Sequence, residues 1–202
     1  MYQTLLNNFL TTHPIREKTP SAAAITHLLL KNISQDDPVD FANLMAQGLK
    51  KSNPARQAAV DLSKTAIANA ATGTEVVQLM RKEQENTNHM PLIKKALAFE
   101  GDVFLDVLRR FKTNMTDHFI ELTAQFLVKS TTNPAEELIS DFNQIKNPYA
   151  KSVALIVLGF RAGEAHIPWM IEQYHQLKKQ YPTETFYQGA YFGLIEMEVR
   201  FK

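Results

Sequence analysis

The sequence of 202 residues contains no cysteine. This absence excludes a disulfide framework, a thiolate nucleophile and a cysteine-ligated zinc site. It also fits a reducing compartment, and we expect a cytoplasmic protein. Glycine is scarce as well, with seven residues. The sequence has neither the glycine-rich phosphate loop of nucleotide-binding proteins nor the nucleophile elbow of hydrolases.

Neither sign of charge is in excess. The 22 Lys and Arg residues balance 21 Asp and Glu residues, which leaves a net charge of +1. No overall field therefore draws the chain to nucleic acid or to a membrane surface. The most apolar run, residues 152–160, is about half as long as a membrane span. The composition predicts a soluble globular protein, and the length predicts a single domain over residues 1–202.

Apolar residues recur at intervals of three and four along most of the chain. Two examples are the stripe of Phe41, Leu44, Met45 and Leu49 and the stripe of Leu105, Val107, Leu108 and Phe111. This spacing is typical of helices that bury one face. Because no segment has the alternation of a strand, we predict an all-α fold.

Proline and glycine predict where these helices begin and end. An acceptor side chain followed by proline marks four helix starts, because proline at the first helical position loses no hydrogen bond. The four pairs are Asp37-Pro38, Asn53-Pro54, Asn133-Pro134 and Asn147-Pro148. Three glycines are expected to end helices in the left-handed conformation: Gly73, Gly101 and Gly163. Together these signals predict about twelve short helices.

Pairing consecutive helices gives a repeat. The first helices of the pairs start near Ser21, Pro54, Met90, Thr116, Pro148 and Pro182, at intervals of 26 to 36 residues. A repeated helix pair buries its apolar faces by stacking on its neighbours. We therefore expect a right-handed α-solenoid of five to six antiparallel pairs. Helix 2–11 would cap its N-terminal end and helix 182–200 its C-terminal end. An irregular helical bundle is the alternative.

One segment resembles a known repeat. Residues 147–171 have an Ala- and Leu-rich helix that ends in Leu158-Gly159, a turn with Gly163-Glu164, and a second helix that opens with Ile167-Pro168. This pattern resembles a HEAT repeat of the armadillo type, and the resemblance is clearest over residues 147–180. It implies a superhelical scaffold without chemistry of its own.

Two further patterns have competing interpretations. Glu172 and His175 form the one Glu-x-x-His of the sequence. A carboxylate-bridged metal site needs two such motifs, so we expect a solvated helix face and no metal. The spacing of Gly189 and Gly193 predicts close packing against a neighbouring helix.

Basic residues gather near the C-terminal ends of the second helices. They are Lys50, Lys51, Arg81, Lys82, Arg109, Arg110, Lys112, Lys146, Lys178 and Lys179. In a stacked array these positions would line up as one basic ridge, which could bind an anion such as nucleic acid. Favourable interaction with the helix dipoles predicts the same arrangement without any binding function.

From the sequence we predict a non-catalytic scaffold that binds a protein or peptide and needs no cofactor. A nucleic-acid-binding protein that uses the basic ridge is the first alternative. A metal-dependent all-α enzyme that uses Glu172 and His175 is the second. The sequence identifies neither the partner nor the residues that contact it.

Overall fold

The structure is a computed structural model that describes residues 1–15, 19–48, 53–113 and 116–202. Within these ranges the chain is helical and contains no strand, which confirms the all-α prediction. The α-helices are α1 (Tyr2–Thr12), α2 (Ala22–Ser34), α3 (Phe41–Gly48), α4 (Pro54–Asn69), α5 (Gly73–Lys82), α6 (His89–Ala98), α7 (Glu100–Thr113), α8 (Asp117–Lys129), α9 (Ala135–Ser140), α10 (Pro148–Arg161), α11 (Ile167–Gln180) and α12 (Gln188–Phe201). Three short 3₁₀ turns are η1 (Asn86–Asn88), η2 (Phe142–Gln144) and η3 (Glu164–His166).

Two of the predicted Asn-Pro starts are confirmed. The Asn53 side chain accepts a hydrogen bond from the Ala55 amide at 3.0 Å, and Asn147 accepts one from Tyr149 at 2.9 Å. A proline follows at the start of each helix. These caps satisfy amides that have no partner within the helix.

The prediction at Asp37-Pro38 is wrong. Helix α3 begins at Phe41, and its first turn is capped by Asp40, which accepts a hydrogen bond from the Asn43 amide at 3.1 Å. The aspartate three residues further on is the better cap because it lies directly before the apolar period of the helix.

The predicted left-handed glycine caps are also wrong. No glycine in the described ranges has a positive φ. Gly73 opens α5 behind the capping box of Thr72 and Glu75, and Gly101 lies within α7. Helices such as α10 end instead in an extended residue, Ala162, because the next helical turn starts only two residues later.

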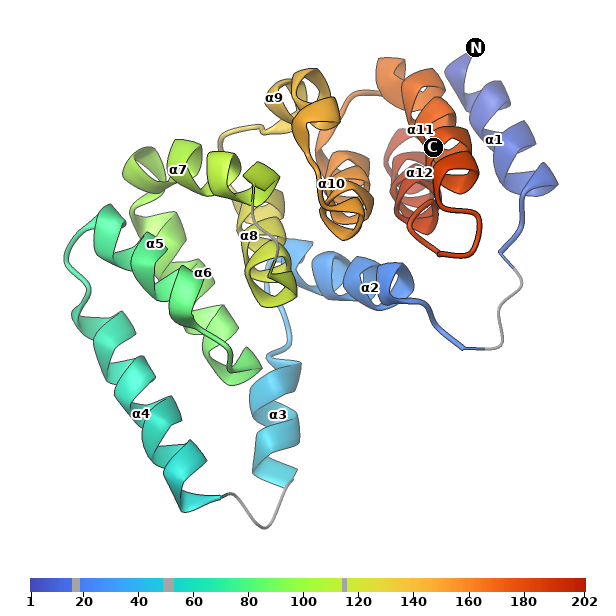
Figure 1. The fold of residues 1–202 in the computed structure, drawn as a ribbon. Coiled ribbons are helices and arrows are strands. Elements are labelled where there is room, and N and C mark those ends of the chain that lie inside the picture. The colour runs from blue at the N-terminus through green and yellow to red at the C-terminus, as the bar shows by residue number, and fades with distance from the viewer. Residues whose placement is uncertain (16–18, 49–52, 114–115) are drawn as a thin grey trace.

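Consecutive helices from α4 to α8 pack against one another, as do α9 with α10 and α11 with α12 (Figure 1). Helices α4, α6, α8, α10 and α12 form one row in which each helix packs against the next. On the other side of this row α5 packs against α7, while α9 and α11 pack against the helices that follow them, α10 and α12.

The terminal helices are not where the sequence placed them. Helix α1 packs against α11 and α12, at the opposite end from the predicted N-terminal cap. The buried Phe9 explains this position, since its ring lies 4.9 Å from that of Tyr174 in the aromatic-rich C-terminal part. Helix α12 begins at Gln188 rather than at residue 182, and it is covered by α1 and α2 instead of ending the array.

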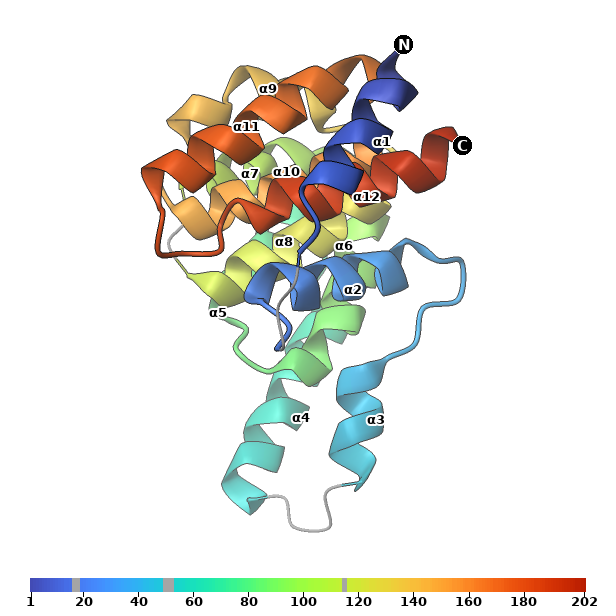
Figure 2. The ribbon, with the colours of Figure 1, turned by 90° about the vertical axis from the view of Figure 1, so that its right-hand side faces the viewer.

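Helix α2 crosses the row of first helices. It packs against α8, α10 and α12 (Figure 2) and so is not stacked as the first member of a pair with α3. Its buried face contains the polar residues Thr26 and His27, which find partners on α10 and α12. Because these polar contacts hold α2 against α10 and α12, α2 does not pair with α3.

The tightest packing joins α10 and α12, as the glycine spacing predicted. A Cβ atom on Gly189 would overlap Ser152, and one on Gly193 would overlap the backbone of Leu155. Every residue of α10 from Ser152 to Gly159 is buried. The core of the molecule is therefore centred on this helix.

Candidate functional site

The predicted basic residues that the structure describes do lie at or near helix ends. Arg81 and Lys82 end α5, while Arg109, Arg110 and Lys112 lie in the last turns of α7. Lys146 precedes α10, and Lys178 and Lys179 lie in the last turn of α11. Lys50 and Lys51 lie outside the described residues.

Two of these cations share one carboxylate. Asp106 lies 2.6 Å from Arg109 and 2.8 Å from Arg110. Burial alone would raise the pKa of Asp106, but the hydrogen bonds from the two arginines hold it below its usual value. The positive charge of Arg109 and Arg110 is therefore partly balanced by Asp106 of the same helix.

Two more cations have local partners. Lys112 forms an ion pair with Asp141, and the Lys178 ammonium lies 5.6 Å and 5.2 Å from the ring centroids of Tyr174 and Tyr187. Such contacts are those of ordinary surface cations. A binding function for the basic ridge remains a prediction.

The Glu172–His175 pair is engaged in contacts with its neighbours. Glu172 accepts a hydrogen bond from Gln176 at 2.8 Å, and the His175 ring lies 5.4 Å from that of His13. Among the described residues, no group of three or more His, Asp or Glu side chains is placed to hold a metal ion.

A cluster of polar side chains joins α2 to α12, with Glu196 and His27 buried and Lys31 partly exposed. Glu196 Oε1 lies 2.7 Å from His27 Nε2 and 3.0 Å from the Lys31 ammonium. Burial would raise the pKa of Glu196, but the hydrogen bonds from His27 and Lys31 hold it below its usual value. Beside this cluster lies an open cavity of ≈ 440 Å³. It is lined by α2, by α12 and by the segment before α2, with Leu28 and Phe192 among its apolar walls.

Helix α3 is amphipathic, but its apolar face points away from the protein. Phe41, Leu44 and Met45 are spaced to share one face, and their exposed fractions are 53%, 59% and 68%. No residue of α3 is buried. The sequence predicted a buried face for this stripe, and that prediction is wrong for the three residues. Leu49, the fourth residue of the stripe, lies outside the described residues. In the second stripe Leu105 alone is exposed, whereas its three companions are buried.

The protein holds α3 on the side of Ala42 and Asn43, the two half-buried residues of the helix. Helix α3 packs against η1, where the Asn43 side chain donates a hydrogen bond to the Thr87 carbonyl at 3.1 Å. Asn43 also donates to Asp40 at 2.6 Å. The backbone of η1 therefore fixes the orientation of the helix.

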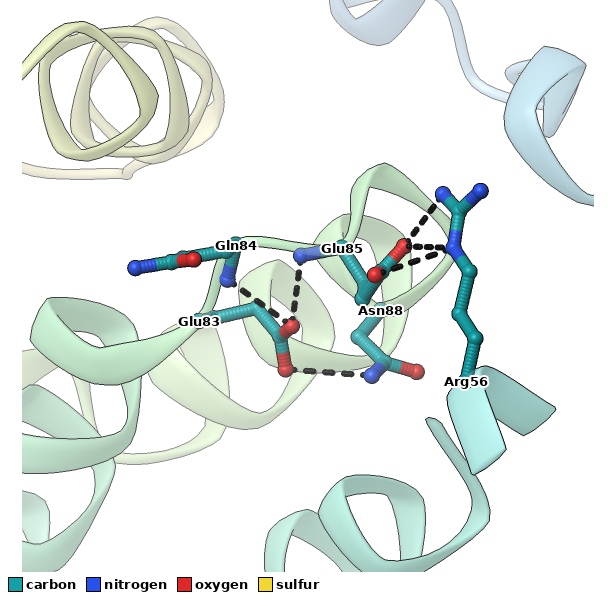
Figure 3. Close-up of polar contacts among 5 residues, drawn as sticks. All are labelled: Arg56, Glu83, Gln84, Glu85 and Asn88. Carbon is teal, nitrogen blue, oxygen red and sulfur yellow. Dashed lines mark hydrogen bonds and ion pairs between the residues drawn. The ribbon is translucent and has the colours of Figure 1, made fainter. Parts of the chain in front are cut away.

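The same segment holds α4 (Figure 3). The buried Glu83 carboxylate accepts hydrogen bonds from the amides of Gln84 and Glu85 at 3.0 Å and 2.7 Å, and from the Asn88 side chain at 3.0 Å. It also accepts one from Ser63 of α4. Since these donors come from several residues along the turn, the Glu83 carboxylate holds the turn in one conformation.

A salt bridge adds a second link between this turn and α4. Arg56 donates to both carboxylate oxygens of Glu85, at distances between 2.7 Å and 3.1 Å (Figure 3). We refer to α3 and α4 as the arm, and to residues 83–88 as the polar turn that holds both helices. Sequence reasoning missed the arm because amphipathic spacing does not tell which face a helix buries.

Behind the polar turn lies a buried histidine. Burial, with a smaller effect of the nearby His118, lowers the pKa of His89 to about 4, against the opposing charges of Glu83 and Asp40. Its Nε2 atom and the Asn88 Oδ1 atom have no hydrogen-bond partner among the described residues. His89 is therefore neutral at pH 7.

Comparison of the chain with protein-family models, with curated proteins and with solved structures gave no match. The fold places the chain in the broad class of all-helical proteins. None of the described helices has both the length and the apolar character needed to cross a membrane.

Proposed function

We propose that the chain is a non-catalytic, HEAT-like α-solenoid that binds another protein through the exposed apolar face of α3. The row of α4, α6, α8, α10 and α12, in which each helix packs against the next, supports the solenoid interpretation, as does the HEAT-like sequence of residues 147–171. Binding by shape and apolar contact requires no cofactor. The absence of cysteine favours a cytoplasmic location.

The inverted packing of α3 is the observation that carries the proposal. A surface helix normally buries its apolar stripe, whereas α3 presents Phe41, Leu44 and Met45 outward and is held to the protein through the polar Asn43. Grouped exposed apolar residues of this size mark interaction sites in proteins. A helix of eight residues is also marginally stable alone, so a partner that covers the apolar face stabilises it.

The distribution of exposed side chains points to the same part of the molecule. Of the eleven large apolar residues that are exposed within the described ranges, five lie between positions 39 and 62: Val39, Phe41, Leu44, Met45 and Leu62. Elsewhere α2 already covers α8, α10 and α12. The arm is therefore a more accessible docking surface than the row of first helices.

Selection of peptide ligands tests this function. The full chain, immobilised at low density, is panned against a random peptide display library. We expect the enriched peptides to be apolar and to bind with micromolar affinity. The Leu44→Glu, Met45→Glu variant should lose this binding, and Leu105→Glu, which changes a leucine of α7 that is at least as exposed, should keep it. Equal binding to all three proteins would contradict the proposal.

A further inference from the structure

We infer that His13 and His175 form a binding site for a divalent transition-metal ion such as Zn²⁺, with two imidazole ligands and with water in the remaining positions. His13 directly follows α1, and His175 lies in α11. These two helices pack against each other, so the ion ties the first helix of the chain to its neighbour. The site shares no helix with the α3 face, and the inference does not depend on the proposed function.

The spacing of the two rings fits a single metal ion. A Zn–N bond is about 2.0 to 2.1 Å long, which places the ion about 3.2 Å from the centroid of each ligating ring. The centroids of the His13 and His175 rings are 5.4 Å apart, and the ring planes are inclined at 74°. At this separation the two lines from ion to centroid meet at about 115°, close to the tetrahedral angle that zinc prefers. The distance between the rings therefore already suits the ion.

The hydrogen bonds of His13 leave a lone pair on its Nε2 atom. The Nδ1 atom lies 3.2 Å from the Phe9 carbonyl and 2.9 Å from the Thr12 hydroxyl. The carbonyl only accepts, and the hydroxyl already donates to the carbonyls of Asn8 and Phe9, so Nδ1 carries the hydrogen. The lone pair of the neutral ring then lies on Nε2. A hydrogen bond from the other ring nitrogen to a backbone carbonyl is the usual support of a histidine that binds a metal.

Packing holds both histidine rings in place. The rings of Phe9 and Tyr174 each contact both histidines, at centroid distances between 4.6 Å and 5.9 Å. Phe9 and Tyr174 are buried, whereas His13 is half-buried and His175 is exposed, so an ion reaches the site from solvent. Ligands that packing holds in this way lose little freedom when the ion binds.

The surroundings of the pair predict moderate affinity. On α11 the acidic Glu172 lies three residues before His175 and the basic Lys178 three residues after it, so the charges of these neighbours offset each other. Among the described residues no third His, Asp or Glu side chain completes the set of ligands. A structural zinc site has four protein ligands. We therefore expect this site to bind zinc more weakly, with a micromolar dissociation constant.

Calorimetric titration of the full chain with ZnCl2 tests the site. The protein carries no affinity tag, and EDTA followed by dialysis removes any metal beforehand. We expect one zinc ion per chain at the tightest site. His13→Gln and His175→Gln should each weaken binding about 100-fold, because each removes one of two ligands. His118→Gln, which changes an exposed histidine of α8, should bind zinc as the parent does. MgCl2 should not bind, because Mg²⁺ prefers oxygen ligands.

The position of the ion and its effect on α1 give a second readout. Paramagnetic Cu²⁺ also prefers imidazole, and at substoichiometric amounts it should broaden the side-chain NMR signals of His13 and His175 before those of the other histidines. Zinc should slow hydrogen exchange in α1, because the ion adds a link to α11. His118→Gln should keep this effect of zinc, and His175→Gln should lose it.

Several results would overturn the inference. One is zinc binding that either His13→Gln or His175→Gln retains at the parent's affinity, since the ion would then not bridge the two helices. Another is the absence of saturable zinc binding by the parent chain up to about 1 mM. Circular dichroism without zinc checks that each variant keeps the helical content of the parent. Cu²⁺ broadening of the parent's histidine signals locates the ion without any substitution.

Discussion

Gly159 of α10 and Gly193 of α12 touch backbone to backbone. A Cβ atom on Gly159 would overlap the Cα and carbonyl atoms of Gly193, and neither helix can move aside without disturbing the core. The contact allows α10 and α12 to approach more closely than helices with larger residues. The glycines thus fix the distance between two helices at the centre of the molecule.

We therefore expect Gly193→Ala to lower the free energy of unfolding by about 3 kcal/mol, as overpacking of a close helix contact does. Urea denaturation followed by circular dichroism measures the change. Gly101→Ala is the matched control, because its Cβ would meet no atom within 4 Å. This control should be neutral or stabilise α7 by about 0.5 to 1 kcal/mol. A Gly193→Ala protein as stable as the parent would mean that the two helices are further apart.

His89 should make stability depend on pH. Its pKa is about 4 in the folded protein and 6.5 as the unperturbed value, so the unfolded chain binds the proton first as the pH falls. The contribution of His89 to the free energy of unfolding is complete above pH 6.5 and is lost progressively towards pH 4. The free energy of unfolding should thus fall by about 3 kcal/mol over this window.

Urea titrations at several pH values between 7 and 4 measure this dependence. His89→Gln should flatten it, because glutamine does not titrate. His175→Gln, on the exposed side of α11, should leave it as in the parent. An equal slope in His89→Gln and the parent would show that His89 is not the titrating group.

Glu83→Ala should loosen the arm. The substitution leaves the donors of Gln84, Glu85, Asn88 and Ser63 without their carboxylate, a loss of about 2 to 4 kcal/mol when the groups are buried. Hydrogen exchange should accelerate in residues 83–89 and in α4, and should be unchanged in α10 and α12. The control is Gln84→Ala, whose side chain is exposed. Unaltered exchange in α4 after Glu83→Ala would show that the polar turn does not hold the arm.

We expect the basic ridge to bind DNA more weakly than micromolar affinity. Arg109 and Arg110 share Asp106, and Lys112 pairs with Asp141, so these cations are partly balanced within the protein. Fluorescence anisotropy with a labelled duplex at about 50 and 200 mM salt measures the binding. Micromolar affinity at the lower salt with a steep loss at the higher salt would favour the nucleic-acid alternative.

Local signals in the sequence predicted where helices begin better than they predicted where the helices lie in the fold. Asn53 and Asn147 cap their helices as expected because a cap depends on neighbouring residues alone. The glycine spacing of α12 likewise predicted a close helix contact, although it did not identify α10. In contrast, the path of α2 depends on Glu196 and Tyr149, which are more than 100 residues away in sequence. No periodicity within α2 indicates such partners.

The candidate site shows the same limit. The spacing of Phe41, Leu44 and Met45 predicted an amphipathic helix, and the helix is present. The face that it turns to the protein is set by Asn43 and the carbonyl of Thr87, a contact between distant segments. Amphipathic periodicity gives the two faces of a helix but not which of them lies against the protein. For α3 that choice decides whether the stripe is core or docking surface.

Chemical labelling of a single cysteine on α3 tests the central claim most directly. Because the chain has no cysteine of its own, Leu44→Cys and Leu105→Cys each carry one reactive thiol on an exposed helix position. If the α3 face binds a protein partner, maleimide labelling of Leu44→Cys should slow several-fold when a selected display peptide is present in excess, and labelling of Leu105→Cys should not change. A labelling rate of Leu44→Cys that the bound peptide leaves unchanged would contradict the account.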